Sequence, residues 1–312
     1  MKRVVITGPT GAIGIALISE CMKQGIEVYA LCRKGSERIG RIPKSELVHI
    51  VECDLAQMKN LSTEKIKKCD VFYHLGWAAT IGDGRNDMPL QLQNVQYTLD
   101  AVKLAERLGC EAFVGAGSQA EYGRFEGKLN ASVPAFPENG YGMAKLCAGQ
   151  MSRVECQKRN IRHIWTRILS VYGPYDGEFT MITSTIRKLL NGEVPALTKG
   201  EQQWDYLYSG DAARALLLLG EKGVDGKIYC LGSGKAQPLL HYMETIRDAI
   251  NTDAKLGVGE IPYGPKQVMY LCADIEDLRR DTGFEPQIDF AEGIKRTIDW
   301  IKEKGDCDER EA

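Results

Sequence analysis

The first twenty-two residues constrain the fold most, because they combine a short apolar strand, a glycine-rich turn and a helix. Residues 2–14 read Lys-Arg-Val-Val-Ile-Thr-Gly-Pro-Thr-Gly-Ala-Ile-Gly, and an apolar stretch follows over residues 15–22. A strand that passes through closely spaced glycines into a helix lets backbone N–H groups and the helix dipole meet a pyrophosphate. We expect Gly8 to make the tight turn, Gly11 to let the phosphates approach, and Gly14 to allow close packing of helix and strand.

Composition and charge narrow the class of protein. The 312 residues, 44% apolar and 26% charged, suffice for one large α/β domain, or for a core domain with a smaller lobe. The 40 basic and 42 acidic side chains leave a net charge of −2, which argues against nucleic acid or a membrane surface as a partner. No apolar run reaches the roughly 18–20 residues that span a bilayer, and no signal peptide is evident, so we expect a cytoplasmic protein. The ten cysteines and four histidines lack ligand spacing, so we expect no metal.

The chain alternates strand and helix patterns for about 170 residues, which predicts a doubly wound parallel sheet of the Rossmann type. Strands are expected at residues 27–32, 46–51, 70–74, 112–115 and 161–168, and helices at residues 88–108 and 141–159. Beyond Gly173 the alternation loosens into helices near residues 181–190, 209–221, 239–250 and 290–302, with a strand at 227–230 and a frayed end at 306–312. This later part is typical of a smaller C-terminal lobe.

Two stretches, residues 115–118 and 141–145, carry the expected chemistry. Tyr141 and Lys145 are four residues apart on a predicted helix, so their side chains share one face. A nearby ammonium favours the phenolate and lowers the pKa of the tyrosine, which allows proton exchange near neutral pH. Ser118 ends a strand at the sheet edge where open α/β folds bind ligands, so its hydroxyl is placed to hydrogen-bond a substrate carbonyl.

With these motifs in place, the sequence resembles an extended short-chain dehydrogenase/reductase of the NAD-dependent epimerase/dehydratase family, whose members modify sugar nucleotides. The resemblance runs nearly end to end and is carried by residues 7–14, 70–76, 94–109, 117–123, 141–145, 167–174 and 205–213. It implies an NAD(P)-binding Rossmann domain over residues 1–172 and 203–232. It also implies a substrate-binding lobe over residues 173–202 and 233–312.

The resemblance assigns roles to particular residues. Tyr141 would be the acid/base, Lys145 would lower its pKa and hold the nicotinamide ribose, and Ser118 would orient the reacting C–O group. The cofactor would contact Gly8, Thr10, Gly11, Ala12, Ile13, Gly14, Arg33, Asp54, Leu55, Leu75, Gly76, Trp77, Tyr141 and Lys145. A homodimer joined as a four-helix bundle through residues 88–108 and 141–159 is also implied.

The end of the second predicted strand bears on the choice of cofactor. An acidic residue there would bind the adenosine ribose of NAD, but the position holds Cys32, followed by Arg33. With no carboxylate to repel a 2′-phosphate and several cations nearby, NADP(H) is favoured, while NAD(H) remains open.

The motif that contains Ser118 narrows the reaction. The family's dehydratases carry Asp-Glu directly after this position, whereas the sequence has Gln119 and Ala120, and Glu121 would point elsewhere on an extended segment. A net reductase draws on NADPH, so we favour reduction of a 4-keto-(6-deoxy)hexose nucleotide. The alternatives are an NAD-dependent 4-epimerase and, less favoured, a non-catalytic cofactor sensor.

The expected substrate contacts are Thr80, Gln119, Trp204 and Lys266. Two of these depart from the family pattern, because Trp204 and Lys266 stand where many relatives have an arginine for the diphosphate. A tryptophan cannot grip a diphosphate in a bidentate way, and a lysine acts as a point charge. Either another cation supplies the charge or the substrate is less anionic; the candidates are Arg187, Lys188, Lys199 and Arg214.

Overall fold

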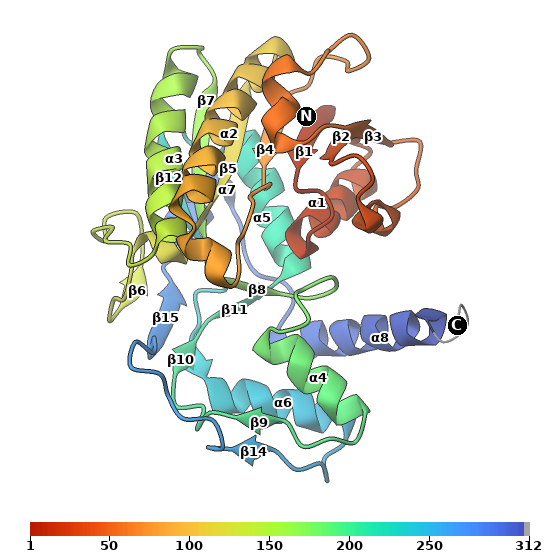
Figure 1. Ribbon diagram of the computed structural model, residues 1–312, viewed down its shortest axis with the longest axis vertical. Coiled ribbons are helices and arrows are strands. Elements are labelled where there is room, and N and C mark those ends of the chain that lie inside the picture. Colours follow the sequence, from red (N-terminus) through yellow and green to blue (C-terminus); the bar gives the residue numbers. More distant parts are fainter. Residues whose placement is uncertain (309–312) are drawn as a thin grey trace.

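The computed structural model describes residues 1–308 of the chain, with side chains through residue 303. A seven-stranded parallel sheet forms its centre, in the order β12-β7-β5-β4-β1-β2-β3 (Figure 1). These strands are β1 (Arg3–Thr7), β2 (Glu27–Cys32), β3 (Val48–Glu52), β4 (Val71–His74), β5 (Ala112–Ser118), β7 (Arg162–Ile168) and β12 (Lys227–Leu231). This sheet confirms the expected Rossmann-type α/β class.

Helices cover both faces of the sheet. On one face lie α1 (Ala12–Lys23) and α5 (Ser209–Lys222), and on the other α2 (Met88–Arg107) and α3 (Gly140–Gln157) pack side by side (Figure 1). Alternate residues of β1 serve the two cores: Val4 and Ile6 face α1 and α5, whereas Val5 faces α2. Burial on both faces explains why this strand reads as a continuous apolar run in the sequence.

Strand β5, which contains Gly115 and Gly117, continues beyond the expected residues 112–115 to Ser118, which ends the strand as predicted. Glycine in a strand often marks the close approach of another group. Here the group is the indole of Trp165 on the neighbouring β7, and a Cβ on either glycine would overlap it. The two glycines therefore make room for a tryptophan, and Ser118 becomes the last residue of a central strand.

The smaller lobe is built mainly from the C-terminal half of the chain and lies below the sheet in Figure 1. Its helices α4 (Met181–Leu190), α6 (Leu239–Ile250) and α8 (Phe290–Asp308) share an apolar core with Tyr172. Its short strands are β6 (Lys128–Leu129), β8 (Ser170–Tyr172), β9 (Ala196–Leu197), β10 (Gln203–Trp204), β11 (Tyr206–Tyr208), β13 (Gln237–Pro238), β14 (Gly257–Val258) and β15 (Tyr270–Ala273). Helix α8 includes the start of the segment that we expected to fray, and residues 309–312 of that segment lie outside the described residues.

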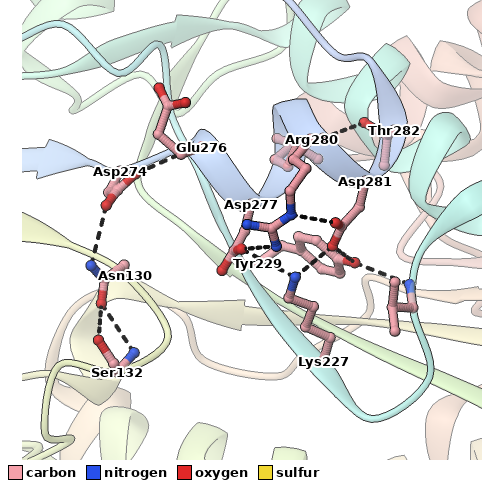
Figure 2. A network of polar contacts seen from close by, with 12 residues as sticks. Asn130, Ser132, Lys227, Tyr229, Asp274, Glu276, Asp277, Arg280, Asp281 and Thr282 are labelled. Atoms are coloured by element: carbon pink, nitrogen blue, oxygen red, sulfur yellow. Dashed lines mark hydrogen bonds and ion pairs between the residues drawn. The ribbon is translucent and has the colours of Figure 1, made fainter.

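One helix of the C-terminal third, α7 (Glu276–Thr282), returns to the edge of the large sheet. Its carboxylates meet β12 in the polar network of Figure 2, where the Lys227 ammonium lies 3.1 Å from Asp277 and 2.6 Å from Asp281. The hydroxyl of Tyr229 also donates to Asp281 at 2.8 Å. Neither α7 nor β15 was predicted, since both are short and lack a clear apolar period.

No described helix has the length and apolar character needed to cross a membrane. Among the described side chains, no group of three or more His, Cys, Asp or Glu residues could hold a metal ion.

Candidate active site

The turn between β1 and α1 contains two glycines that the fold requires, Gly8 and Gly14, and one that it does not require, Gly11. Gly8 has φ +66°, and a Cβ there would lie 2.8 Å from the backbone nitrogen of Gly76. A Cβ on Gly14 would overlap the carbonyl oxygen of Gly8 and lie 2.8 Å from Pro9. In contrast, Gly11 is exposed, has φ −82°, and its Cβ would meet nothing closer than 3.8 Å. The chain's own packing leaves space over Gly11 at the start of α1, which fits a bound pyrophosphate.

The end of β4 packs against this turn. The hydroxyl of Thr7 accepts the N–H of Gly76 at 3.0 Å and is hydrogen bonded to Nδ1 of His74 at 2.9 Å. A Cβ on Gly76 would lie 3.0 Å from the side chain of Leu55. The structure therefore brings Leu55 and residues 75–76 to the glycine turn, as a dinucleotide site in a Rossmann fold requires.

The carboxylate of Asp54 has a local role as well. It caps the short 3₁₀ helix η2 (Leu55–Asn60), accepting the N–H of Ala56 at 3.1 Å, while the side chain of Gln57 accepts the N–H of Asp54. This capping box holds Asp54 and Leu55 beside the sheet edge.

At the end of β2, Cys32 is buried in the core on the α1 side of the sheet, and burial raises the pKa of its thiol to about 11. The next side chain, Arg33, is exposed and lines a depression of about 550 Å³. The depression is also lined by Lys34, Gly35, Ser36, Glu37, Arg38, Asp54 and Gln57. Three cations and two carboxylates therefore surround it.

The catalytic candidates come together where β5 ends and α3 begins. The side chain of Asn139 caps α3 by accepting the N–H of Gly142 at 2.9 Å, which fixes the turn that carries Tyr141. The Ser118 hydroxyl lies near enough to the phenol of Tyr141 to favour its ionised form. Burial raises the pKa of Tyr141, and the Ser118 hydroxyl and the positive charge of Arg85 partly offset that rise.

Lys145 lies on the expected face of α3 but contacts other groups. Its ammonium donates to the carbonyl of Ala116 at 2.5 Å and lies 3.8 Å from the centroid of the Trp77 ring. Burial lowers the pKa of Lys145 to about 7. The sequence predicted that Lys145 lowers the pKa of Tyr141; instead the net direction for Tyr141 is upward, because burial dominates.

Trp77, on the segment after β4, contacts both α2 and α3. Its indole N–H donates to the side chain of Gln91 at 2.9 Å, and its ring meets the Tyr141 ring edge-on at 6.1 Å. The Trp77 ring thus contacts both Lys145 and Tyr141, and the ammonium of Lys145 is itself 5.7 Å from the centroid of the Tyr141 ring.

Sequence reasoning placed Glu121 on an extended segment, but residues 119–121 form the 3₁₀ helix η4. The carboxylate of Glu121 points into the core, where it accepts the N–H of Ser118 at 2.9 Å and the indole N–H of Trp165 at 3.0 Å. It also pairs with Arg167 at 2.8 Å. The pattern Ser-x-x-Glu is a capping-box signature, so a local signal for this role was present.

The expected substrate residues fall into two groups. Thr80 and Gln119 lie on the segments that follow β4 and β5, close in sequence to the cofactor loop and to Ser118. Trp204 is half-buried in the smaller lobe, where its indole N–H donates to Ser170 at 2.8 Å. Lys266 is exposed, and its positive charge helps to lower the pKa of Glu138. Of the four cations considered as replacements for the missing arginine, Arg214 forms an ion pair with Asp211 at 3.0 Å.

Arg85 was missed by sequence reasoning. It belongs to the 3₁₀ helix η3 (Asp83–Asn86), and its guanidinium lies 4.4 Å from the centroid of the Tyr141 ring. No local pattern connects residues so far apart in the sequence, and only the fold brings them together.

Comparison with known proteins agrees with this geometry. A sequence model of the NAD dependent epimerase/dehydratase family matches residues 4–232. A putative UDP-glucose 4-epimerase of Methanocaldococcus jannaschii is 27% identical, over 96% of this chain and 98% of the relative. A dTDP-glucose 4,6-dehydratase of Streptomyces niveus is 25% identical, over 96% and 93%. A UDP-N-acetylglucosamine 4-epimerase of Methanobrevibacter ruminantium, solved with UDP-N-acetylmuramic acid, superposes with a TM-score of 0.87 at 24% identity, covering 97% of this chain and 99% of that one.

The fold and the family match define an enzyme of the extended short-chain dehydrogenase/reductase type. The chain belongs to the NAD-dependent epimerase/dehydratase family.

The glycine geometry gives a first prediction. We expect Gly11→Ala to weaken dinucleotide affinity about tenfold or more, because its methyl group would occupy the phosphate space, while stability falls by at most about 1 kcal/mol. Gly14→Ala should lower both the dinucleotide affinity and the stability of the fold, since its Cβ overlaps the backbone of the turn. Calorimetric titration with NADPH and NADH, beside thermal unfolding, measures the two effects. Gly264→Ala, where a Cβ meets nothing within 4 Å, is the matched control. Unchanged affinity in Gly11→Ala would show that the phosphates bind elsewhere.

Proposed function

We propose that the chain is an NADPH-preferring oxidoreductase that reduces the 4-keto group of a (6-deoxy)hexose nucleotide, with Tyr141 as the general acid. The observation that carries the proposal is that Ser118, at the end of β5, and Lys145, on α3, both lie beside the phenol of Tyr141. No carboxylate that could remove a substrate proton follows Ser118, since Gln119 and Ala120 occupy those positions and Glu121 is buried in its ion pair.

The mechanism follows from the positions of the side chains. When bound, the nicotinamide supplies the hydride. The hydroxyls of Ser118 and Tyr141 together hold the carbonyl oxygen of the substrate, and the phenol of Tyr141 gives its proton to that oxygen as the carbon is reduced. The ammonium of Lys145, which contacts the carbonyl of Ala116 and the ring of Trp77, would be the donor to a ribose hydroxyl of the cofactor. Gly8, Gly11 and Gly14, with Thr10, Ala12 and Ile13, would hold the pyrophosphate.

The substrate class is supported by the relatives' names, which are those of enzymes acting on UDP- and dTDP-sugars. Thr80 and Gln119 are the proposed contacts on the Rossmann side. Trp204 and Lys266 are the proposed contacts on the lobe.

The second candidate function is 4-epimerisation with retained NAD. It is supported by the same Ser118–Tyr141–Lys145 set and by the epimerases among the relatives. A cofactor-sensing protein without turnover is less well supported, because a sensor has no need of the paired hydroxyls.

The reaction is tested with a panel of 4-keto-6-deoxy sugar nucleotides. Loss of NADPH absorbance supports the reductase, whereas interconversion of sugar nucleotides without added cofactor supports the epimerase. We expect Tyr141→Phe to lower kcat by ~10²–10⁴-fold, since it removes the general acid. Tyr97→Phe, which loses only a hydroxyl hydrogen bonded to Gln93, should stay near wild type. Activity of Tyr141→Phe within a few-fold of wild type would contradict the mechanism.

Cofactor preference gives a separate prediction. Arg33 is the first exposed side chain after β2 and lines the depression described above, where a 2′-phosphate would lie. Because hydrogen bonds to charged groups contribute about 1.5–3 kcal/mol, Arg33→Asp should weaken NADPH binding roughly tenfold or more and leave NADH binding nearly unchanged. Binding titrations with both nucleotides measure this, with Arg187→Asp on α4 as the control. An equal loss for the two nucleotides would refute a 2′-phosphate site at Arg33.

We also propose a homodimer in which α2 and α3 of two copies form a four-helix bundle. The outer faces of these helices expose large apolar side chains, namely Met88, Leu92, Met143, Met151 and Val154. A second copy would cover this surface in a symmetric contact.

The dimer is tested by solution mass. Wild type should sediment at about twice 34.6 kDa, and Leu92→Glu combined with Met151→Glu should sediment as a monomer. Phe179→Glu alters an apolar side chain that is 92% exposed before α4, and it should keep the mass of wild type. A wild-type monomer at micromolar concentration would exclude the bundle.

A further inference from the structure

The segment between β4 and α2 is held rigidly by two buried amides of α2. Asn94 forms a pair of hydrogen bonds with Ala78, accepting its N–H at 2.9 Å and donating to its carbonyl at 3.0 Å. Gln91 donates to the carbonyls of Ala79 and Gly84 at 3.1 and 2.8 Å. Both amide side chains are 1% exposed, so water does not compete for these bonds.

The same segment contacts the first turn of α3. The side chain of Asn86 accepts the N–H of Gly140 at 3.1 Å. A Cβ on Gly140 would lie 3.0 Å from the carbonyl oxygen of Arg85 and 2.8 Å from the sulfur of Met88. The glycine therefore lets η3 pack directly against the turn that carries Tyr141.

This packing places a guanidinium on the catalytic ring. One nitrogen of Arg85 donates to the carbonyl of Thr80 at 3.0 Å, and the guanidinium carbon lies 4.4 Å from the centroid of the Tyr141 ring. Within the part of the chain that the structure describes, Arg85 forms no ion pair with a carboxylate. The positive charge of Arg85 is therefore free to act on the phenol of Tyr141.

Other charged groups near the phenol act less directly. The ammonium of Lys145 is 5.7 Å from the centroid of the ring, is hydrogen bonded to Ala116, and loses its proton more readily than a free lysine. Glu121, from η4, acts in the opposite direction but is neutralised by Arg167. An arginine keeps its charge at every physiological pH. The permanent cation next to Tyr141 is thus Arg85.

We propose that Arg85 is a positioning residue for the reaction, whose guanidinium holds the ring of Tyr141 and stabilises the phenolate left when the proton is given to substrate. The kinetic part of this inference rests on the proposed function, in which Tyr141 is the general acid. The electrostatic part concerns only the two side chains and can be measured without substrate.

The electrostatic part is tested by NMR on protein labelled with ¹³C-tyrosine, in which the signal absent from Tyr141→Phe identifies Tyr141. An opposite charge within about 4–6 Å typically lowers a pKa by 1–3 units. We therefore expect the pKa of Tyr141 to rise by about one unit or more in Arg85→Gln and to return most of the way in Arg85→Lys. Arg107→Gln is the control, because Arg107 of α2 also donates to loop carbonyls, those of Leu61 and Met58. Circular dichroism across the titration shows that each variant remains folded.

Turnover gives the second readout. In Arg85→Gln we expect kcat to fall about tenfold, the KM for NADPH to change little, and the basic limb of the pH profile to move upward with the pKa of Tyr141. An unchanged pKa of Tyr141 in Arg85→Gln overturns the proposal for Arg85. A raised pKa with unaltered turnover instead overturns Tyr141 as the general acid, and with it the proposed function.

Discussion

The buried ion pair between Glu121 and Arg167 is the interaction on which the rest of the site depends. The two side chains are 1% and 3% exposed, and their charged atoms lie 2.8 Å apart. Removing one partner of such a pair leaves an uncompensated charge in a medium of low dielectric constant, at a cost of about 3–5 kcal/mol. Because Glu121 also accepts the N–H of Ser118, and Arg167 is paired in register with Gly117 across the sheet, the ion pair fixes the end of β5. The hydroxyl of Ser118 therefore has a defined position before any ligand binds.

Trp165 sets the distance between β5 and α3, the helix that carries Tyr141. Its ring lies where Gly115 and Gly117 of β5 would carry side chains, and a Cβ on Gly149 of α3 would lie 2.7 Å from the indole. Three glycines on two elements thus accommodate one tryptophan, whose indole N–H donates to the carboxylate of Glu121. The packing of α3 on β5, and with it the approach of Tyr141 to Ser118, depends on this fit.

Much of this arrangement could be predicted, because it is encoded locally. Apolar strands, the glycine turn and the four-residue spacing of Tyr141 and Lys145 are local patterns, and the sheet and its helices follow from them. The length of β5 was underestimated because glycines read as a loop unless the facing tryptophan is known. The direction of the Lys145 amine and the contact of Arg85 with Tyr141 depend on residues distant in the chain, which no spacing rule connects. The capping box of Ser118 and Glu121 was visible in the sequence, yet its second role in the buried ion pair was not.

The burial of Ala120 bears on how the chemistry of this chain can diversify. Ala120 is 6% exposed, and its carbonyl lies where a Cβ on Gly142, the residue after Tyr141, would be. A longer acidic side chain at position 120 would need room at a buried position, next to the turn that carries Tyr141. Exchanges at positions 119 and 120 that supplied an acidic pair would therefore require changes in the packing around residue 120 as well.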